Sequence, residues 1–329
     1  MTNIDLPKMP KDNADRRMNF AGRNEIAEKL SSIPGHPLYT FVKENEVLRK
    51  LLADAVAAAQ SMAVTTEQLE KIRWLSMVHY AKKGDLLYPH LKTKYEVTGP
   101  SDVMWTDDDT LRDGWNLLRK FSDYDDRWYK KFLELAGSAE NMIKKEKQIL
   151  FPICAALFTE EEWALIYRDA KDYENVPEID VEKWSEAEKL MQEKAVPAKN
   201  EEIAMPGGSM TIEQLTALLN TIPMEITFVD ADNINRFFNE GPKAFKRPGM
   251  ALGREVFSCH PPKIEPMVRS IIEDFRDGVR DSVPVWAKKG GRDMLVTYMA
   301  VRDREGKYVG TVELVQDMEF ARKHFQKEA

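Results

Sequence analysis

The chain has 329 residues, 43% hydrophobic and 31% charged, which is typical of a folded protein long enough for two domains. Its net charge of −7 is spread along the sequence, so no basic patch favours nucleic acid or an anionic membrane. The two cysteines, Cys154 and Cys259, lie in different halves, which excludes a disulfide framework and a CxxC metal clip. No apolar run approaches the roughly 20 residues of a membrane span. Two lone thiols fit a reducing compartment, so we expect a cytoplasmic protein.

The first half of the chain is predicted to be helical. Residues 1–22 are polar and aperiodic, and we expect a flexible segment there. Residues 23–175 carry apolar stripes at helical spacing, which predicts a four-helix bundle with short connections. The four helices are expected at Pro37–Met62, Thr65–Lys92, Asp107–Phe121 and Ala139–Ala156, with a break at Gly99-Pro100 and a short capped helix from Thr159 to Lys171.

A change of composition marks the domain boundary. Residues 176–209 contain prolines and glycines around a short charged helix, Val181–Lys194, and are predicted to be a linker. Residues 210–329 then form the second domain, which ends in a short helical tail.

The second domain has an α/β pattern. Strands are predicted at Ile222–Asp230, Asn233–Asn239, Val283–Lys289, Arg292–Arg302 and Tyr308–Asp317, with an amphipathic helix at Lys263–Gly278. The turn pairs Ala231-Asp232 and Gly290-Gly291 separate neighbouring strands. This order of elements, with the run Ile226–Asp232 at its start and Asp303–Gly310 at its last hairpin, resembles the PAS fold. The resemblance implies a five-stranded antiparallel sheet that acts as a sensor module.

A PAS sheet curls around its helices, which implies a pocket for a small ligand. The residues expected to line this pocket are Phe228, Phe237, Phe257, His260, Met267, Trp286 and Tyr298. A filled apolar core is the alternative. His260, next to Cys259 and before a helix, has the chemistry of a haem ligand, although capping or loop hydrogen bonding is favoured over haem.

Histidines in the first half point to a second resemblance. His36 opens the first helix, His79 precedes Leu86-Leu87-Tyr88-Pro89, and Glu146 precedes Ile149-Leu150-Phe151-Pro152. This pattern resembles hemerythrin-type (HHE) cation-binding bundles. Together with the strings Gly99–Trp105 and Asp107–Arg112, it is similar to a bacterial and archaeal family that fuses such a bundle to a PAS domain.

The resemblance implies metal ligands at His36, His79 and Glu146, with Asp109 as a fourth. The set is sparse, because two expected ligand positions fall at about Gly84 and Met142. His90 does not fill the gap, since 11 residues of helix separate it from His79 by roughly 16 Å. A nitrogen and oxygen donor set suits iron, manganese or zinc. A metal-free bundle stays open as the alternative.

Three functions follow as hypotheses. The first is a cytosolic sensor or regulator of signal transduction, in which the bundle binds a metal and the PAS domain senses a small ligand or a redox signal. The second is a non-haem metal oxidoreductase acting on a small oxidant, although no common catalytic motif supports an enzyme. The third is a metal-free interaction module. We expect a homodimer and an unidentified protein partner, and the sequence names neither the signal nor that partner.

Overall fold

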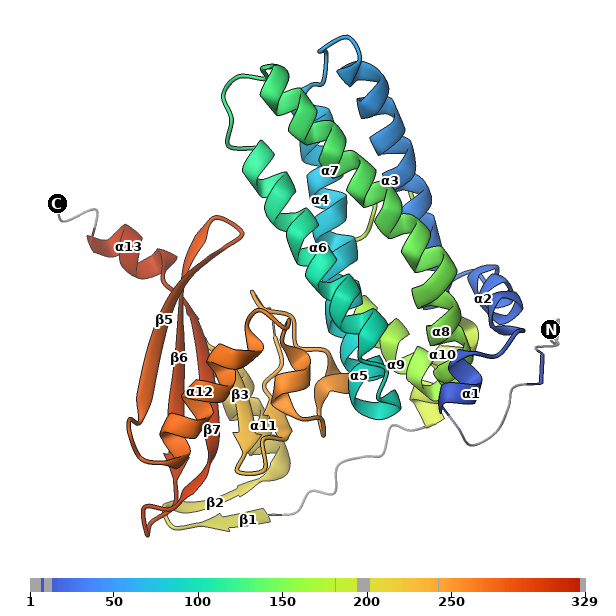
Figure 1. The fold of residues 1–329 in the computed structure, drawn as a ribbon. Helices are drawn as coiled ribbons and strands as arrows, with labels where there is room; N and C mark the ends of the chain where they lie inside the picture. Colours follow the sequence, from blue (N-terminus) through green and yellow to red (C-terminus); the bar gives the residue numbers. More distant parts are fainter. Residues whose placement is uncertain (1–6, 9–13, 181, 194–201, 242, 326–329) are drawn as a thin grey trace. The chain divides into compact units, whose positions relative to one another are not determined.

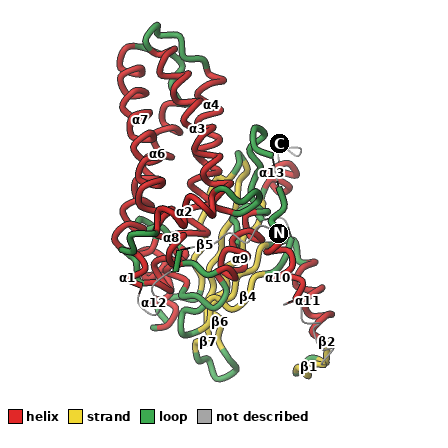
Figure 2. The backbone as a smooth tube through the Cα atoms, turned by 90° about the vertical axis from the view of Figure 1, so that its right-hand side faces the viewer, coloured by secondary structure: helices red, strands yellow, loops and turns green. Residues whose placement is uncertain are grey.

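The computed structural model describes residues 7–8, 14–180, 182–193, 202–241 and 243–325. The chain forms two compact units, Met1–Lys194 and Ala195–Ala329, and each is described by itself. Within the described ranges, the first unit contains helices and loops, and the strands belong to the second (Figures 1 and 2). None of the helices in these ranges combines the length and apolar character that a bilayer crossing requires.

Four long helices form the body of the first unit (Figure 1). They are α3 (Pro37–Ala59), α4 (Thr66–Lys82), α6 (Gly99–Leu118) and α7 (Asp126–Lys145). Shorter helices extend or cover them, namely α1 (Ala14–Met18), α2 (Arg23–Ser31), α5 (Tyr88–Tyr95), α8 (Phe151–Leu157), α9 (Glu160–Ala170) and α10 (Ser185–Glu193). The all-α bundle expected from the sequence is therefore confirmed.

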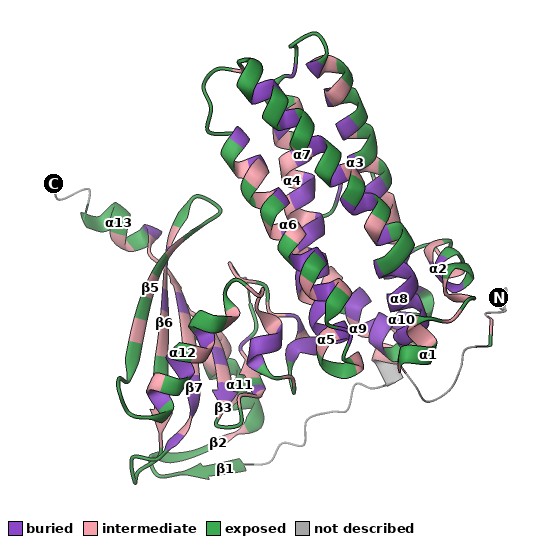
Figure 3. Ribbon diagram, in the orientation of Figure 1, coloured by how far each residue is buried: buried purple, intermediate pink, exposed green. Residues whose placement is uncertain are grey.

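Capping residues set several helix starts. Thr65 and Thr159 each form a capping box, in which the threonine hydroxyl and a side chain three residues later satisfy free backbone amides. His36 caps α3, with Pro37 in the first turn, where a proline is tolerated. Between the helices lies a core that includes Trp105, Trp115 and Trp128, each at most 2% exposed. Figure 3 shows this buried stripe along the inner faces of the long helices.

Two π-helical turns interrupt the bundle helices. Turn η1 (Lys83–Leu87) joins α4 to α5, and turn η2 (Glu146–Leu150) joins α7 to α8. Each turn is followed by a proline, Pro89 or Pro152, two residues after its end. A proline has no N–H for the usual i−4 carbonyl and clashes with it, which favours a wider turn just before it. Each turn changes the helical register by one residue at that point.

Several predicted boundaries were wrong. Gly99 and Pro100 begin α6, eight residues before the predicted start at Asp107, because proline is compatible with the first helical turn. Helix α7 begins at Asp126, which Asp125 caps, and not at Ala139. In the segment predicted to be flexible, residues 1–6 and 9–13 lie outside the described residues, whereas Ala14–Met18 forms α1.

The predicted linker contributes to the first unit. Helix α10 packs against α9, and Trp184 and Ala187 are buried there. The Tyr167 hydroxyl donates a 2.8 Å hydrogen bond to Glu188, which ties the two helices together. Residues 194–201 lie outside the described residues.

The second unit is built on a five-stranded antiparallel sheet, as the sequence predicted, and its strand order is β4-β3-β7-β6-β5. Figure 1 shows β5, β6, β7 and β3 of this sheet. The strands are β3 (Glu225–Asp230), β4 (Asn235–Phe238), β5 (Ser282–Lys289), β6 (Arg292–Arg302) and β7 (Tyr308–Asp317). A small hairpin, β1 (Glu202–Met205) and β2 (Gly208–Thr211), precedes helix α11 (Ile212–Thr221). Helix α12 (Glu265–Arg276) packs on β6 and β7, and α13 (Glu319–Phe325) follows β7.

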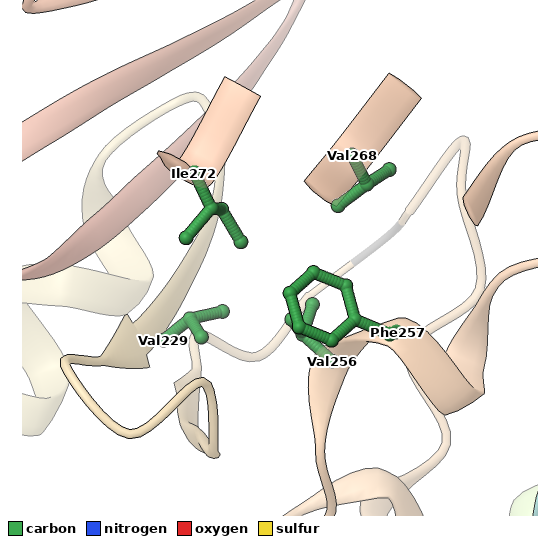
Figure 4. Close-up of a cluster of buried hydrophobic side chains, with 5 residues drawn as sticks. All are labelled: Val229, Val256, Phe257, Val268 and Ile272. Carbon is green, nitrogen blue, oxygen red and sulfur yellow. The ribbon is translucent and has the colours of Figure 1, made fainter. Parts of the chain in front are cut away.

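An apolar core lies between the sheet and α12. Figure 4 shows one part of it, in which Val229 of β3 meets Val256, Phe257, Val268 and Ile272. Two 3₁₀ turns, η3 (Gly249–Ala251) and η4 (Val256–Cys259), shape the segment between β4 and α12. The face of the sheet turned toward α12, called here the inner face, therefore holds the core of this unit.

Candidate functional site

The interior of the bundle contains a network of ionisable side chains. It comprises Glu44 of α3, His79 and Lys82 of α4, Lys83 of η1, Asp108 of α6 and Glu146 of η2. Each of these residues is 5% exposed or less. Charged groups are seldom fully buried unless they are paired, so their partners decide what this site can do.

His79 lies between two carboxylates. Its Nδ1 is 2.8 Å from Glu44 Oε2, and its Nε2 is 2.9 Å from Glu146 Oε2. Carboxylates accept hydrogen bonds, so both ring nitrogens must donate and the ring is an imidazolium. Burial by itself lowers the pKa of His79, but the charges of Glu146 and Glu44 outweigh it and raise that pKa above its ordinary value.

Lys83 lies between the other two carboxylates. Its Nζ donates a 2.8 Å hydrogen bond to Asp108 Oδ1 and a second, short one to Glu146 Oε1. The ammonium also lies over the Tyr80 ring, 4.5 Å from the ring centroid, which is a cation–π contact. The ammonium is therefore compensated by two carboxylates and one aromatic ring.

Glu146 accepts hydrogen bonds from three side chains of the bundle interior. Besides Lys83 and His79, it accepts a 2.6 Å hydrogen bond from Asn45 Nδ2. Burial would raise the pKa of Glu146, but Lys83 and His79 lower it to about 2, so this carboxylate is ionised. Burial and the nearby Glu146 charge raise the pKa of Asp108 to about 6, despite hydrogen bonds from Lys83 and from the Tyr88 hydroxyl at 2.8 Å.

The remaining pair, Glu44 and Lys82, closes the network. Lys82 Nζ donates to Glu44 Oε1, and with His79 it lowers the pKa of Glu44 against the opposing effect of burial. Three carboxylates thus face three cationic groups, and their formal charges sum to zero. A small cavity of about 90 Å³ lies beside this pair, with Gly35, Pro37 and Phe41 also in its lining.

The π-turns explain why Lys83 and Glu146 meet. Each residue is the first of its turn, and the two turns share one sequence pattern, Lys83-Gly-Asp-Leu-Leu-Tyr-Pro89 and Glu146-Lys-Gln-Ile-Leu-Phe-Pro152. A charged residue thus stands six positions before a proline in both segments. π-turns occur frequently at functional sites. This repeated pattern is the sequence signal that points to Lys83.

The structure brings together only two of the four predicted metal ligands. His79 and Glu146 are hydrogen bonded, as described above. His36 instead caps α3, where its Nδ1 accepts from the Leu38 amide at 3.0 Å, and its ring packs between Trp163 and Trp184. Nε2 of His36 has no hydrogen-bond partner among the described residues, and burial lowers the pKa of His36 to about 3.

The other ligand predictions also need correction. Asp109 points to Arg112 and forms an ion pair with it, whereas its neighbour Asp108 is buried in the network. One residue turns a helix by about 100°, so only one of the two can face the core. The residue that faces the site near Gly84 is Lys83. A side chain at Gly84 would meet the Trp105 ring, with a Cβ 3.2 Å from its Nε1.

These donors do not fit a metal ion. Both nitrogens of His79 carry protons that carboxylates hold, and all four oxygens of Glu44 and Glu146 accept hydrogen bonds. Metal binding requires a bare imidazole nitrogen and unprotonated donors that are free to coordinate. The Lys83 ammonium is placed between the carboxylates that a cation would bridge. His90, which the sequence excluded as a further ligand, lies elsewhere, with its Nε2 2.6 Å from Glu162 Oε1.

The second unit has a polar row on the inner face of its sheet. Thr227 of β3, Glu313 of β7 and Tyr298 of β6 lie opposite one another across the three strands. Arg247, in the segment after β4, donates to Thr227 Oγ1 at 3.1 Å and to Glu313 Oε2 at 2.7 Å. Nearby, His260 donates from Nδ1 to the Val256 carbonyl at 2.8 Å, and burial lowers the pKa of His260.

The predicted pocket residues divide between several places. His260 and Tyr298 lie at this polar row, and Phe257 lies in the adjacent apolar core (Figure 4). Phe228 and Phe237 pair with each other on the opposite face, because the residues whose side chains are buried in β3 are Glu225, Thr227 and Val229. Trp286 is 65% exposed and Met267 is 44% exposed, so neither lines an interior pocket.

Comparison with known proteins identifies both parts of the chain. Residues 36–154 match the hemerythrin HHE cation binding domain, and residues 215–319 match a PAS domain. No curated protein matched the chain.

Three solved structures are similar over about a third of the chain. The C-terminal domain of a protein from Streptococcus mutans has 37% identity and a TM-score of 0.36, with 38% of this chain and 97% of that chain covered. A sensory box sensor histidine kinase from Vibrio cholerae has 13% identity and a TM-score of 0.25, with 31% of this chain and 87% of that chain covered. The PAS domain of a protein from Colwellia psychrerythraea has 13% identity and a TM-score of 0.26, with 32% of this chain and 95% of that chain covered. The matches to the two family models, and not these partial likenesses, show that the chain joins a hemerythrin HHE domain to a C-terminal PAS domain.

Proposed function

We propose that this protein is a regulatory sensor whose PAS domain binds a small anionic ligand at Arg247. The observation that carries the proposal is the ion pair of Arg247 with Glu313 on the inner face of the sheet. The two side chains are 17% and 18% exposed, so the pair is mostly removed from water. Such pairs contribute little to stability, because desolvation offsets much of their attraction.

The surroundings of Arg247 match the needs of an acidic ligand. A guanidinium binds a carboxylate or another oxyanion through two parallel hydrogen bonds. Thr227 and Tyr298 add hydroxyl groups in the same row, and a hydroxyl can donate a hydrogen bond to a ligand oxygen. A ligand carboxylate that replaced Glu313 as the partner of Arg247 would still neutralise the guanidinium, provided that the Glu313 side chain turned away from it toward water.

A ligand that displaced the Glu313 side chain from Arg247 would also alter the segment that carries Arg247. Asn239 and Glu225 hold this segment to β3, since Asn239 bonds the backbone of Ile226 and Glu225 accepts from the amides of Ala244 and Phe245. Arg247 adds a further tie, to Glu313. A ligand that binds only the opened form shifts the population toward it, and a protein partner that contacts this segment can detect the change.

The test is a thermal-shift and calorimetric screen of small carboxylates and inorganic oxyanions against the full chain. Arg247→Met should abolish binding of any hit, whereas the control Arg292→Met, at a position 62% exposed in its side chain, should bind as the wild type does. Glu313→Gln should bind more tightly, because it removes the internal competitor. Equal affinity of Arg247→Met and the wild type, or no hit in either ligand class, contradicts the proposal.

A further inference from the structure

The buried network of the bundle contains a cation at the point where several helices converge. The Lys83 ammonium contacts Asp108 of α6, Glu146 of η2 and the Tyr80 ring of α4. Ligands from several helices that converge on one interior point are also the way in which a bundle holds a metal ion. Lys83 is completely buried, as are Asp108 and Glu146, so the ammonium is an integral part of the core.

We propose that the Lys83 ammonium replaces the metal ion of a hemerythrin-type bundle, so that this domain assembles its charged core without metal. A second part of the proposal follows from the same geometry: a variant with a carboxylate at position 83 should bind a metal ion in this network. Both parts concern the bundle and are independent of the ligand proposed for the PAS domain.

Charge balance supports this assignment. With Lys83 in place, the formal charges of the six network residues sum to zero. A divalent cation added to this set would leave two uncompensated positive charges in a core from which water is excluded, which is strongly unfavourable. Replacement of Lys83 by glutamate changes the sum to minus two, and to minus three when His79 releases its Nε2 proton to bind a metal, so one divalent cation compensates most of that charge. The substitution therefore reverses the charge preference of the site.

The positions of the donors support it as well. Lys83 lies four residues after His79, so the two side chains share one helix face. Glu44 accepts from His79 Nδ1, which leaves Nε2 directed at Glu146. A carboxylate behind the histidine is the usual support of a metal-binding imidazole. A glutamate at position 83 would join Asp108, Glu146 and His79 in a mixed oxygen and nitrogen set, which suits iron, manganese or zinc.

The first experiment measures metal uptake by the untagged wild-type chain. Protein is incubated without oxygen with Fe²⁺, Mn²⁺ or Zn²⁺ in separate samples, desalted, and analysed for metal by mass spectrometry. We expect less than about a tenth of an ion per chain, and a melting temperature that neither metal nor chelator changes. Stoichiometric metal in the wild type, or a melting temperature that falls with chelator, overturns the proposal.

The second experiment uses Lys83→Glu, with Lys71→Glu as the matched control. Lys71 lies on α4, the helix that leads into η1, but its side chain is 55% exposed and forms an ion pair with the exposed Glu67. We expect Lys83→Glu to take up about one ion per chain, with a rise in melting temperature of roughly 5–10 °C, as tight binding to a unit of this size would give. Lys71→Glu should take up none. A folded Lys83→Glu variant that takes up no metal overturns the second part of the proposal.

A third variant covers the case in which Lys83→Glu does not fold. The charge-swapped variant Lys83→Glu/Glu146→Lys keeps one ammonium between two carboxylates. It should fold without metal and take up none. If the swapped variant folds but takes up stoichiometric metal, the ammonium does not exclude metal and the proposal fails.

Discussion

Replacement of Lys83 by methionine tests how far the bundle depends on its buried ammonium. Methionine has a similar length and no charge, so the change removes the partner of Glu146 and Asp108 with little change of volume. The two carboxylates then face each other in the core, and the network carries one excess negative charge. Removal of one partner from a buried ion pair typically costs about 3–5 kcal/mol of unfolding free energy. For a unit of this size, that corresponds to a fall in melting temperature of roughly 6–20 °C.

The loss should depend on pH, because Asp108 can bind a proton. Burial and Glu146 already raise the pKa of Asp108 to about 6, and removal of Lys83 raises it further. A carboxyl group whose folded-state pKa lies above its unfolded value stabilises the fold at low pH and loses that contribution as pH rises through the folded-state pKa. The destabilisation of Lys83→Met should therefore be full at pH 8 and smaller at pH 5.

Urea unfolding followed by tryptophan fluorescence measures this effect, since six of the seven tryptophans lie in the first unit. Lys71→Met is the exposed control and should change the unfolding free energy by less than about 0.5 kcal/mol. The double variant Lys83→Met/Asp108→Asn should recover about 1–3 kcal/mol, because it removes the one excess negative charge of the network. A wild-type stability for Lys83→Met at pH 8, or no recovery in the double variant, refutes the reasoning.

Three further predictions concern other parts of the chain. Burial lowers the folded-state pKa of His36 to about 3, below its unfolded value. The unfolding free energy of the bundle should therefore fall by about 1.4 kcal/mol per pH unit as pH falls below about 6.5. His36→Asn keeps a helix cap, and in urea titrations it should lack this part of the acid dependence. Gly310→Ala should destabilise the PAS domain by more than about 2 kcal/mol, because its Cβ would lie 2.3 Å from the Val229 carbonyl oxygen, whereas Gly207→Ala, with open space around it, should be nearly neutral. We expect a homodimer by sedimentation, and Trp286→Asp, on the exposed face of the sheet, should shift it toward monomer; an unchanged sedimentation profile argues against that face as the interface.

Much of the fold could be predicted from local patterns. Helical periodicity and capping residues predicted a bundle, and alternating apolar runs with glycine turns predicted the five-stranded sheet. The helix boundary that failed at Gly99 is a place where a residue usually associated with a break begins a helix instead. A glycine and proline pair ends one helix and starts another with equal ease, and only the packed structure distinguishes the two.

The inner face of the sheet shows a different limit. Strand β3 has apolar residues on both faces, since Ile226 and Phe228 alternate with Thr227 and Val229. Alternation predicts that two faces exist, but a shift of one residue exchanges them. The sequence favoured the face with phenylalanine, whereas α12 and the segment with Arg247 cover the face with threonine. The polar row was missed for this reason.

By itself, the sequence determined the types of element, their order, and the presence of His79 and Glu146 on facing helices. Only the tertiary structure decided that Lys83, and not Gly84, reaches the charged network, that Asp108 does so in place of Asp109, and that His36 caps a helix. The physical reason is angular: a helix turns by about 100° per residue and a π-turn adds one residue, so an uncertainty of one position moves a side chain from the core to the surface.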